Sequence, residues 1–144
     1  DTGGKPVGEH EGVAFYTIGQ RKRLPASTNG ALYVVSLDAE TNTVVVGKDE
    51  ELFASGLIAD TCIWSAISDI ETVQESLPVM AKIRYNGTPA KATICAGNEP
   101  DTVAARFDTP QRAVTPGQSA VFFGGEGDEF GQVVIGGGVI REAI

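Results

Sequence analysis

The sequence predicts an all-β protein, in which a small β unit is followed by a closed or nearly closed antiparallel β-barrel of about six strands. Helical periodicity is almost absent, whereas apolar and polar residues alternate over short stretches. These stretches recur at short intervals with Gly or Pro between them, and the 18 glycines fit tight turns and barrel corners. We therefore expect a β unit over residues 1–56 and a β-barrel over residues 57–144.

The first expected strand covers residues 13–18, where side-chain types alternate. Residues 32–37 and 43–46 predict a hairpin, because the Asp, Thr and Asn of residues 38–42 suit a tight turn. Residues 57–65, which contain the only Trp, are expected to form the next strand.

A second hairpin is predicted where residues 79–85 and 91–95 flank Asn86-Gly87. Asn-Gly supplies the positive φ angles that a two-residue hairpin turn requires. Pro89 has no amide hydrogen, so it is expected to delay regular pairing or to mark an edge. Four further strands are expected at residues 102–107, 119–123, 133–135 and 139–141.

Glycine and proline also predict the connections between these strands. Pro116-Gly117 fits the central pair of a type II turn, with Gly in the positive-φ position. The Gly-rich residues 124–127 and 136–138 are interpreted as turns, because phosphate cradles place such glycines before a helix and here a strand is expected to follow. The polar, acidic residues 65–76 are expected to form a long loop or linker.

The formal net charge of −8 argues against a protein that coats nucleic acid by bulk attraction. Basic residues nevertheless gather at residues 21–23 and at Lys82 and Arg84, which allows a local basic patch on an acidic body. No apolar run approaches the ~20 residues of a membrane helix, and no charged-then-apolar leader is visible. Because the chain opens without Met in a polar Gly-rich stretch, we expect it to be part of a longer protein.

No catalytic residue and no metal ligand is predicted in this chain. Cys62 and Cys95 form no C-x-x-C pair, and they are expected to be small buried hydrophobes in a reducing cytoplasm, although one disulfide remains open. His10 is the only histidine, so a His-activated nucleophile or a zinc site is hard to build. A structural hydrogen-bonding role is expected for His10.

Two groups of residues are candidates for contact with RNA. Arg21 and Lys22 follow Gly19 in an expected loop, where their cationic groups can reach phosphates, although a solvated hairpin tip is the alternative. Arg84 and Tyr85 place a guanidinium beside an aromatic ring at a strand end, a combination that suits unpaired RNA.

Gln118 is a third candidate, because it follows the Pro116-Gly117 turn. There its amide could be presented to a base edge or a sugar. A routine turn residue is the alternative interpretation of Gln118, and one of the adjacent pair Arg84 and Tyr85 could equally face the core.

Four ordered motifs resemble the MnmA/TrmU family of tRNA-specific 2-thiouridylases. From Gly8 to Leu24 the chain matches Gly-x-His-x-Gly-x-x-x-Tyr-Thr-Ile-Gly-Gln-Arg-Lys-Gly-Leu, except that Arg23 replaces the usual Gly. The family's Tyr-Val-Val strand appears at residues 33–35. Its Ala-Val-Thr-Pro-Gly-Gln-Ser-Ala-Val-Phe signature and its Gly-Gly-Gly-x-Ile stretch match residues 113–122 and 136–140.

The resemblance implies an ATP-dependent sulfurtransferase that forms 2-thiouridine at the wobble position of tRNA. In this family ATP activates the uridine, a cysteine persulfide supplies sulfur from a sulfur-donor protein, and the PP-loop domain with both catalytic cysteines lies upstream of the region matched here. Neither Cys62 nor Cys95 matches those cysteines. The implied RNA contacts are Arg84, Tyr85 and Gln118.

We therefore predict that this chain positions tRNA and is inactive alone, within a cytoplasmic enzyme whose N-terminal PP-loop domain binds ATP. An alternative is a free-standing β-barrel that binds RNA or protein without chemistry. A third possibility is a small-molecule-binding barrel, which predicts a deep apolar pocket.

Overall fold

The computed structural model describes residues 1–72, 75–124 and 133–144. The chain forms two compact units, Asp1–Phe53 and Ala54–Ile144, and each is considered by itself. The described residues contain eight strands and three short 3-10 helices, so the all-β prediction is confirmed. None of the helices in these ranges has the length and apolar character that a bilayer crossing requires.

The first unit is built on an antiparallel hairpin of β1 (Tyr33–Asp38) and β2 (Thr43–Gly47), as predicted. The Asp38 carboxylate accepts hydrogen bonds from the Glu40 amide at 2.9 Å and from the Thr41 hydroxyl at 2.7 Å. These bonds close the turn locally, and they hold the pKa of Asp38 below its ordinary value. Opposite each other in the ladder, Val34 and Val46 are buried.

The strand predicted over residues 13–18 is wrong. Val13–Phe15 forms the 3-10 helix η1, in which the Tyr16 amide donates to the Val13 carbonyl at 3.0 Å. The alternating pattern could not reveal that the Val13 amide is bonded to the Asn42 side chain at 3.3 Å instead of to a strand. Just beyond the predicted strand, the Gly19 amide donates to the Val34 carbonyl of β1 at 2.8 Å, and the Val34 amide donates to the Gln20 carbonyl at 2.9 Å.

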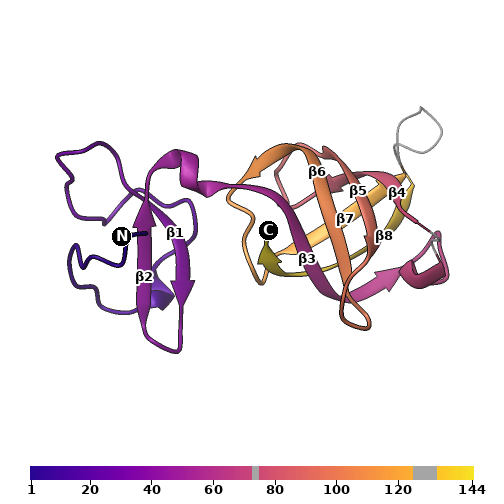
Figure 1. The fold of residues 1–144 in the computed structure, drawn as a ribbon, viewed down its shortest axis with the longest axis horizontal. Helices are drawn as coiled ribbons and strands as arrows, with labels where there is room; N and C mark the ends of the chain where they lie inside the picture. Colours follow the sequence, from indigo (N-terminus) through magenta and orange to yellow (C-terminus); the bar gives the residue numbers. More distant parts are fainter. Residues whose placement is uncertain (73–74, 125–132) are drawn as a thin grey trace. The chain divides into compact units, whose positions relative to one another are not determined.

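The second unit is a closed six-stranded barrel with the order β3-β6-β5-β4-β7-β8 (Figure 1), which confirms the predicted architecture. Its strands are β3 (Phe53–Trp64), β4 (Leu77–Lys82), β5 (Ala90–Ala96), β6 (Val103–Arg112), β7 (Ser119–Gly124) and β8 (Val134–Ala143). The 3-10 helix η2 (Asp49–Leu52) precedes β3, and η3 (Ile70–Thr72) lies in the loop predicted over residues 65–76.

Inward-facing side chains from alternate positions of the strands fill the barrel. The fully buried members include Leu57, Ile94, Val103, Phe122 and Ile140. The rings of Trp64 and Phe122 are stacked with centroids 6.4 Å apart, and Ile70 of η3 is buried against the same cluster. The barrel is therefore a packed core.

The prediction of a turn at Gly136–Gly138 is wrong, since all three glycines lie inside β8. The reason is close approach of neighbouring strands. A Cβ on Gly137 would lie 2.5 Å from the Ala120 carbonyl oxygen, and one on Gly138 would lie 2.6 Å from that of Asp60. Gly124 ends β7, and the remainder of the other Gly-rich stretch, residues 125–127, lies outside the described residues.

The hairpin of β4 and β5 is confirmed, but the two-residue Asn86-Gly87 turn is wrong. The strands end at Lys82 and begin at Ala90, so residues 83–89 form a longer loop. Neither Asn86 nor Gly87 takes a positive φ. Pro89 immediately precedes the first residue of β5, so regular pairing begins just after it.

Candidate nucleic-acid interface

Arg84 lies in the loop that joins β4 to β5 and is exposed. Its Nη2 donates a hydrogen bond to the backbone carbonyl of Arg112, the last residue of β6. The Gly87 amide donates to the Arg84 carbonyl at 3.0 Å, which tightens the loop. One guanidinium thus braces the loop, and its remaining N–H donors can still bind an anion.

Tyr85 follows in the same loop and is 92% exposed. The Nζ of Lys82, at the end of β4, lies 6.0 Å from the centroid of the Tyr85 ring. A cation at this distance is attracted electrostatically to the electron-rich face of the ring. An exposed ring with a cation beside it suits the stacking of a base and the binding of its phosphate.

Gln118 lies immediately before β7, and its side chain is exposed. Gly117 takes a φ of +88° and the Gln118 amide donates to the Thr115 carbonyl at 3.2 Å, which confirms the predicted turn. Lys82 pairs with Val121 in the antiparallel ladder of β4 and β7. The end of β4 and the start of β7 are therefore neighbours.

The structure thus brings Arg84, Tyr85 and Gln118 to one end of the barrel. We refer to residues 82–90 and 111–118 as the Arg84 end. Arg112 joins this group through its carbonyl, and sequence reasoning missed it. No local signal could reveal this, because 28 residues separate the two arginines.

Arg21 and Lys22 belong to the other unit, where both are exposed. The Gln20 side chain braces their loop, since its Oε1 accepts from the Thr17 amide at 3.2 Å and its Nε2 donates to the Lys22 carbonyl at 2.7 Å. The two cations form a separate candidate contact.

His10 has the expected structural role. The Gly12 amide donates to Nδ1 at 3.0 Å, so Nε2 is the nitrogen that donates to the Asn42 carbonyl at 3.1 Å. The Tyr16 ring meets the imidazole edge-on at 5.5 Å. The Nδ1 bond therefore closes the Gly8–Gly12 loop on itself, and the Nε2 bond holds that loop against the turn of the hairpin.

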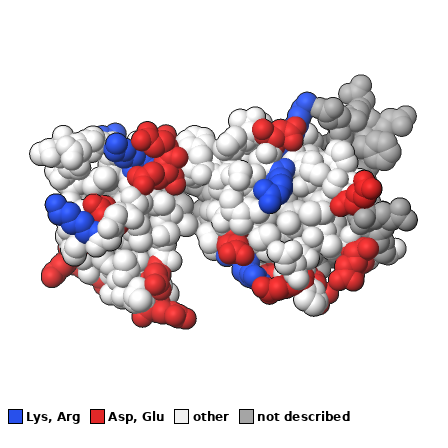
Figure 2. All heavy atoms as spheres, viewed as in Figure 1, with Lys and Arg blue, Asp and Glu red and all other residues white. Residues whose placement is uncertain are grey.

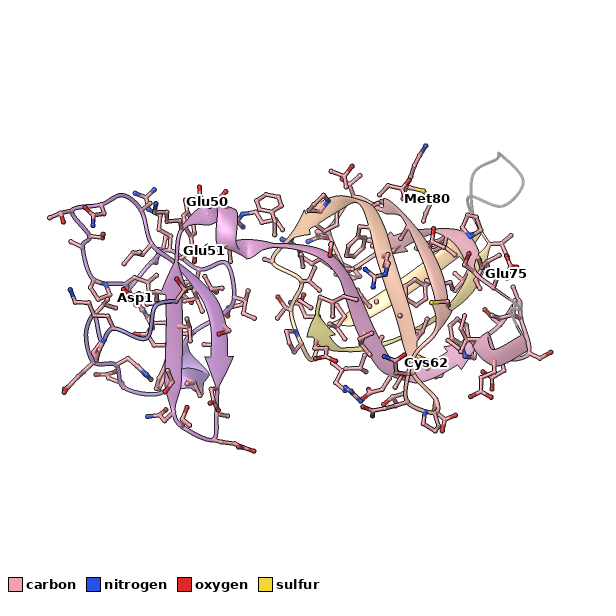
Figure 3. All side chains as sticks on the ribbon, viewed as in Figure 1. Asp1, Glu50, Glu51, Cys62, Glu75 and Met80 are labelled. Carbon is pink, nitrogen blue, oxygen red and sulfur yellow. The ribbon has the colours of Figure 1, made fainter. Side chains whose placement is uncertain are left out.

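Both cysteines are free thiols and half-buried. Burial, followed by the carboxylates of Asp60, Asp101 and Asp69, raises the pKa of Cys62 to about 11. Cys62 lies on β3 (Figure 3). Its thiol stays protonated at neutral pH and is a poor nucleophile. Within the described ranges, no group of three or more His, Cys, Asp or Glu side chains could hold a metal ion.

Acidic and basic side chains are interspersed on the face drawn in Figure 2. On the barrel, Arg141 of β8 forms a bidentate ion pair with Glu99, with N–O distances of 2.8 and 2.9 Å. This pair fixes the loop between β5 and β6. It also lowers the pKa of the Glu99 carboxyl and raises that of the Arg141 guanidinium.

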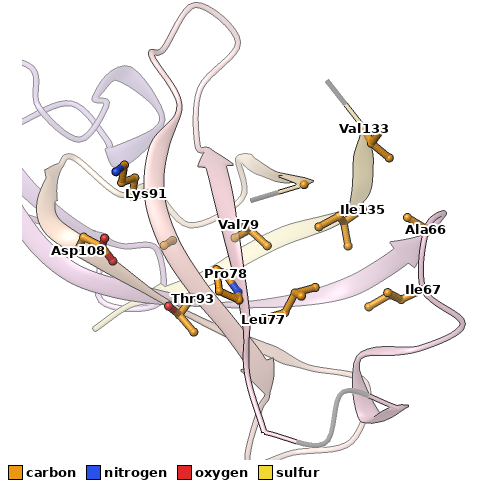
Figure 4. A pocket seen from close by; sticks show the side chains of 12 residues that line it. Ala66, Ile67, Leu77, Pro78, Val79, Lys91, Thr93, Asp108, Val133 and Ile135 are labelled. Atoms are coloured by element: carbon orange, nitrogen blue, oxygen red, sulfur yellow. The ribbon is translucent and has the colours of Figure 1, made fainter. Parts of the chain in front are cut away.

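A mostly apolar cavity of about 620 Å³ lies elsewhere on the barrel. Leu77, Val79 and Ile135 face this hollow, and Lys91 and Asp108 lie at one end of it (Figure 4). Gly124 and Val133, which flank residues outside the described ranges, also line it. Its lining differs in chemistry from the polar and cationic Arg84 end.

Two family models match the chain, one within each of its two compact units. One, described as the tRNA methyl transferase PRC-barrel domain, matches residues 1–48, and the other, described as the aminomethyltransferase beta-barrel domain, matches residues 54–140. The tRNA-specific 2-thiouridylase MnmA of Halothermothrix orenii is 44% identical over 142 residues, which are 99% of this chain. The chain belongs to the tRNA-specific 2-thiouridylase family.

Two other tRNA-specific 2-thiouridylases are similar to this chain to the same degree. The MnmA proteins of Symbiobacterium thermophilum and Rhodopirellula baltica are 44% and 42% identical over 144 residues, covering 100% and 99% of this chain. The chain spans about a third of the curated relatives it matches, namely 37%, 34% and 34% of the three proteins named. It corresponds to the C-terminal part of these 2-thiouridylases.

Proposed function

We propose that this chain is the tRNA-binding and tRNA-positioning region of an ATP-dependent tRNA 2-thiouridylase. The observation that supports it most directly is the convergence of Arg84, Tyr85 and Gln118 at one end of the barrel. A guanidinium, an exposed ring and an amide are the groups with which proteins bind phosphates, unpaired bases and base edges.

The names of the relatives support the same proposal, since each is a tRNA-specific 2-thiouridylase. In the complete protein, an N-terminal PP-loop domain would bind ATP, and a sulfur-donor protein would supply sulfur. Residues 1–56 would form the middle domain and residues 57–144 the C-terminal barrel, in a cytoplasmic enzyme. Phosphate contacts on this chain would fix the register of the tRNA, while the chemistry takes place in a separate pocket.

The test is a salt titration of binding between this chain and unmodified tRNA with a wobble uridine. Binding should weaken steeply as salt rises, because each neutralised phosphate releases counterions. Replacing Tyr85 by Ala should weaken binding by ~1–3 kcal/mol, the usual range for base stacking, whereas Tyr85→Phe should not. Gln118→Ala should weaken binding to a smaller extent.

Arg106→Ala is the matched control, because Arg106 is exposed on β6 opposite Thr93 and away from the Arg84 end. Equal effects of Arg106→Ala and Tyr85→Ala would contradict a specific interface. Absence of binding by both this chain and the complete enzyme would contradict the RNA role. The chain alone should show no ATP-dependent sulfur transfer, and detection of such activity would contradict the proposed division of labour.

The apolar cavity favours a second candidate, the binding of a small apolar molecule by the barrel. NMR spectroscopy of the methyl and backbone amide signals distinguishes the two candidates. A small apolar probe should shift the methyl signals of Leu77 and Val79 if the cavity binds ligands, whereas tRNA should perturb the signals of Tyr85 and Gln118. Saturable perturbation by the probe alone would favour the second candidate.

A further inference from the structure

Arg23 has an unusual backbone conformation, with a φ of +65°. L-residues rarely adopt this left-handed region because Cβ then crowds the backbone, whereas glycine adopts it freely. The motif that this chain resembles has glycine at this position, so the left-handed geometry accounts for the usual residue. In this protein an exposed arginine takes the same conformation at a cost in backbone strain.

A hollow of about 520 Å³ lies beside Arg23 and is lined by Phe15, Gln20, Arg21, Lys22 and Arg23. Phe15, the last residue of η1, is 58% exposed. An exposed aromatic ring and three consecutive residues with cationic side chains therefore border one shallow, open hollow, whose lining is mostly apolar. The two hydrogen bonds of the Gln20 side chain brace the loop that forms it.

Among the described residues, no Asp or Glu lines this hollow. Within the described part of the chain, the side chains of Arg21, Lys22 and Arg23 form no ion pair. Three adjacent cations repel one another, and an external anion relieves that repulsion. A braced loop also loses little conformational entropy when it binds a ligand.

We propose that this hollow is a second RNA-binding site, in which Arg21, Lys22 and Arg23 bind backbone phosphates and an unpaired base stacks on Phe15. Arg21 and Lys22 were already candidates for contact with RNA. The proposal adds Arg23, Phe15 and the hollow that these residues share. The exposed ring favours RNA over an acidic peptide, because it offers a stacking face that a carboxylate does not use. This inference rests on the proposed tRNA-binding function.

The experiment measures binding of the 144-residue chain to a single-stranded oligouridylate and to unmodified tRNA at several salt concentrations. Arg23→Gly should weaken binding about tenfold and reduce the salt slope by about 0.7, the value for one phosphate contact on a single strand. Because it removes the strained φ, the same substitution should leave the melting temperature unchanged or higher. Arg23→Lys should bind nearly as the unsubstituted chain does.

Phe15→Ala should weaken oligouridylate binding, and Phe15→Tyr should not. Lys5→Ala is the charge-matched control, since Lys5 is exposed in the same unit and does not line this hollow. Equal binding by the Arg23→Gly, Phe15→Ala and unsubstituted chains would overturn the inference. If Tyr85 and Gln118 variants lose tRNA binding in that case, the proposed function stands and only the second site is wrong.

Two further outcomes overturn the inference in different ways. Absence of tRNA binding by both the unsubstituted chain and the complete enzyme would remove this site together with the proposed function. Competition by poly-glutamate as strong as that by oligouridylate, and abolished by Arg23→Gly, would identify the hollow as a site for acidic peptides instead.

Discussion

The guanidinium of Arg84 donates a hydrogen bond to the backbone carbonyl of Arg112, which ties the loop after β4 to the end of β6. A cation that braces a loop and also faces solvent can serve both structure and binding. Removal of this side chain therefore tests the interface and the loop together.

Replacing Arg84 by Ala should weaken tRNA binding by ~1–3 kcal/mol, because a charge-assisted contact is lost and the loop that holds Tyr85 is released. Arg84→Lys should retain part of the affinity through its charge but should not restore the carbonyl contact with the same geometry. Fluorescence titration at two salt concentrations measures both effects. An unchanged dissociation constant at moderate salt would show that Arg84 does not face the RNA.

The glycine run in β8 should be intolerant of side chains. A Cβ on Gly138 would lie 2.6 Å from the Asp60 carbonyl oxygen and 2.8 Å from the Cys62 Sγ. We expect Gly138→Ala to lower the free energy of unfolding by ~2–3 kcal/mol, as measured by urea denaturation. Gly3→Ala is the control, with a nearest contact at 3.4 Å, and should change stability by less than ~0.5 kcal/mol. Equal stability of the two variants would contradict the packing of β3 against β8.

The Glu99–Arg141 pair should contribute an acid-sensitive part of the barrel's stability. Its hydrogen bonds to Arg141 lower the folded-state pKa of Glu99, so the stabilisation is present above the unfolded pKa of about 4.3 and is lost as pH falls through the lower folded value. Glu99→Gln should therefore reduce the dependence of the melting temperature on pH below about 4.3. Because Glu99 is exposed, the effect should also shrink in high salt. A pH profile unchanged by the substitution would contradict this role for the pair.

Cys62 should react slowly with iodoacetamide at neutral pH. Burial and nearby carboxylates raise its pKa to about 11, so little thiolate is present to attack. We expect alkylation of the folded chain at least about tenfold slower than that of free cysteine, and rapid alkylation in urea. Mass spectrometry of the peptide that contains Cys62 measures the rate. Fast labelling of the folded chain would indicate an activated thiol and would reopen a chemical role for Cys62.

Features that depend on a few neighbouring residues were predictable from the sequence. Asp38 closes the turn of the first hairpin through bonds to residues two and three positions away, and Gly117 supplies the positive φ of its turn. Alternation of apolar side chains likewise predicted strands of the barrel, because inward and outward positions follow a period of two. The closed barrel was predicted from the regular spacing of these short strands, with Gly or Pro between them. The candidate contacts Arg84, Tyr85 and Gln118 were found from their side-chain chemistry and from the family motifs.

Features that depend on distant segments were decided only by the tertiary structure. Gly136–Gly138 lie within a strand because β8 pairs with β3 and β7 there, and these neighbours approach too closely for a Cβ. The Val13 amide, in the 3-10 helix of residues 13–15, is bonded to the Asn42 side chain. The convergence of Arg84 with Gln118 likewise depends on the pairing of β4 with β7. The sequence by itself determined the local turns, the alternation and the chemical groups available. Their assembly into one surface required contacts between segments tens of residues apart, which local propensity does not encode.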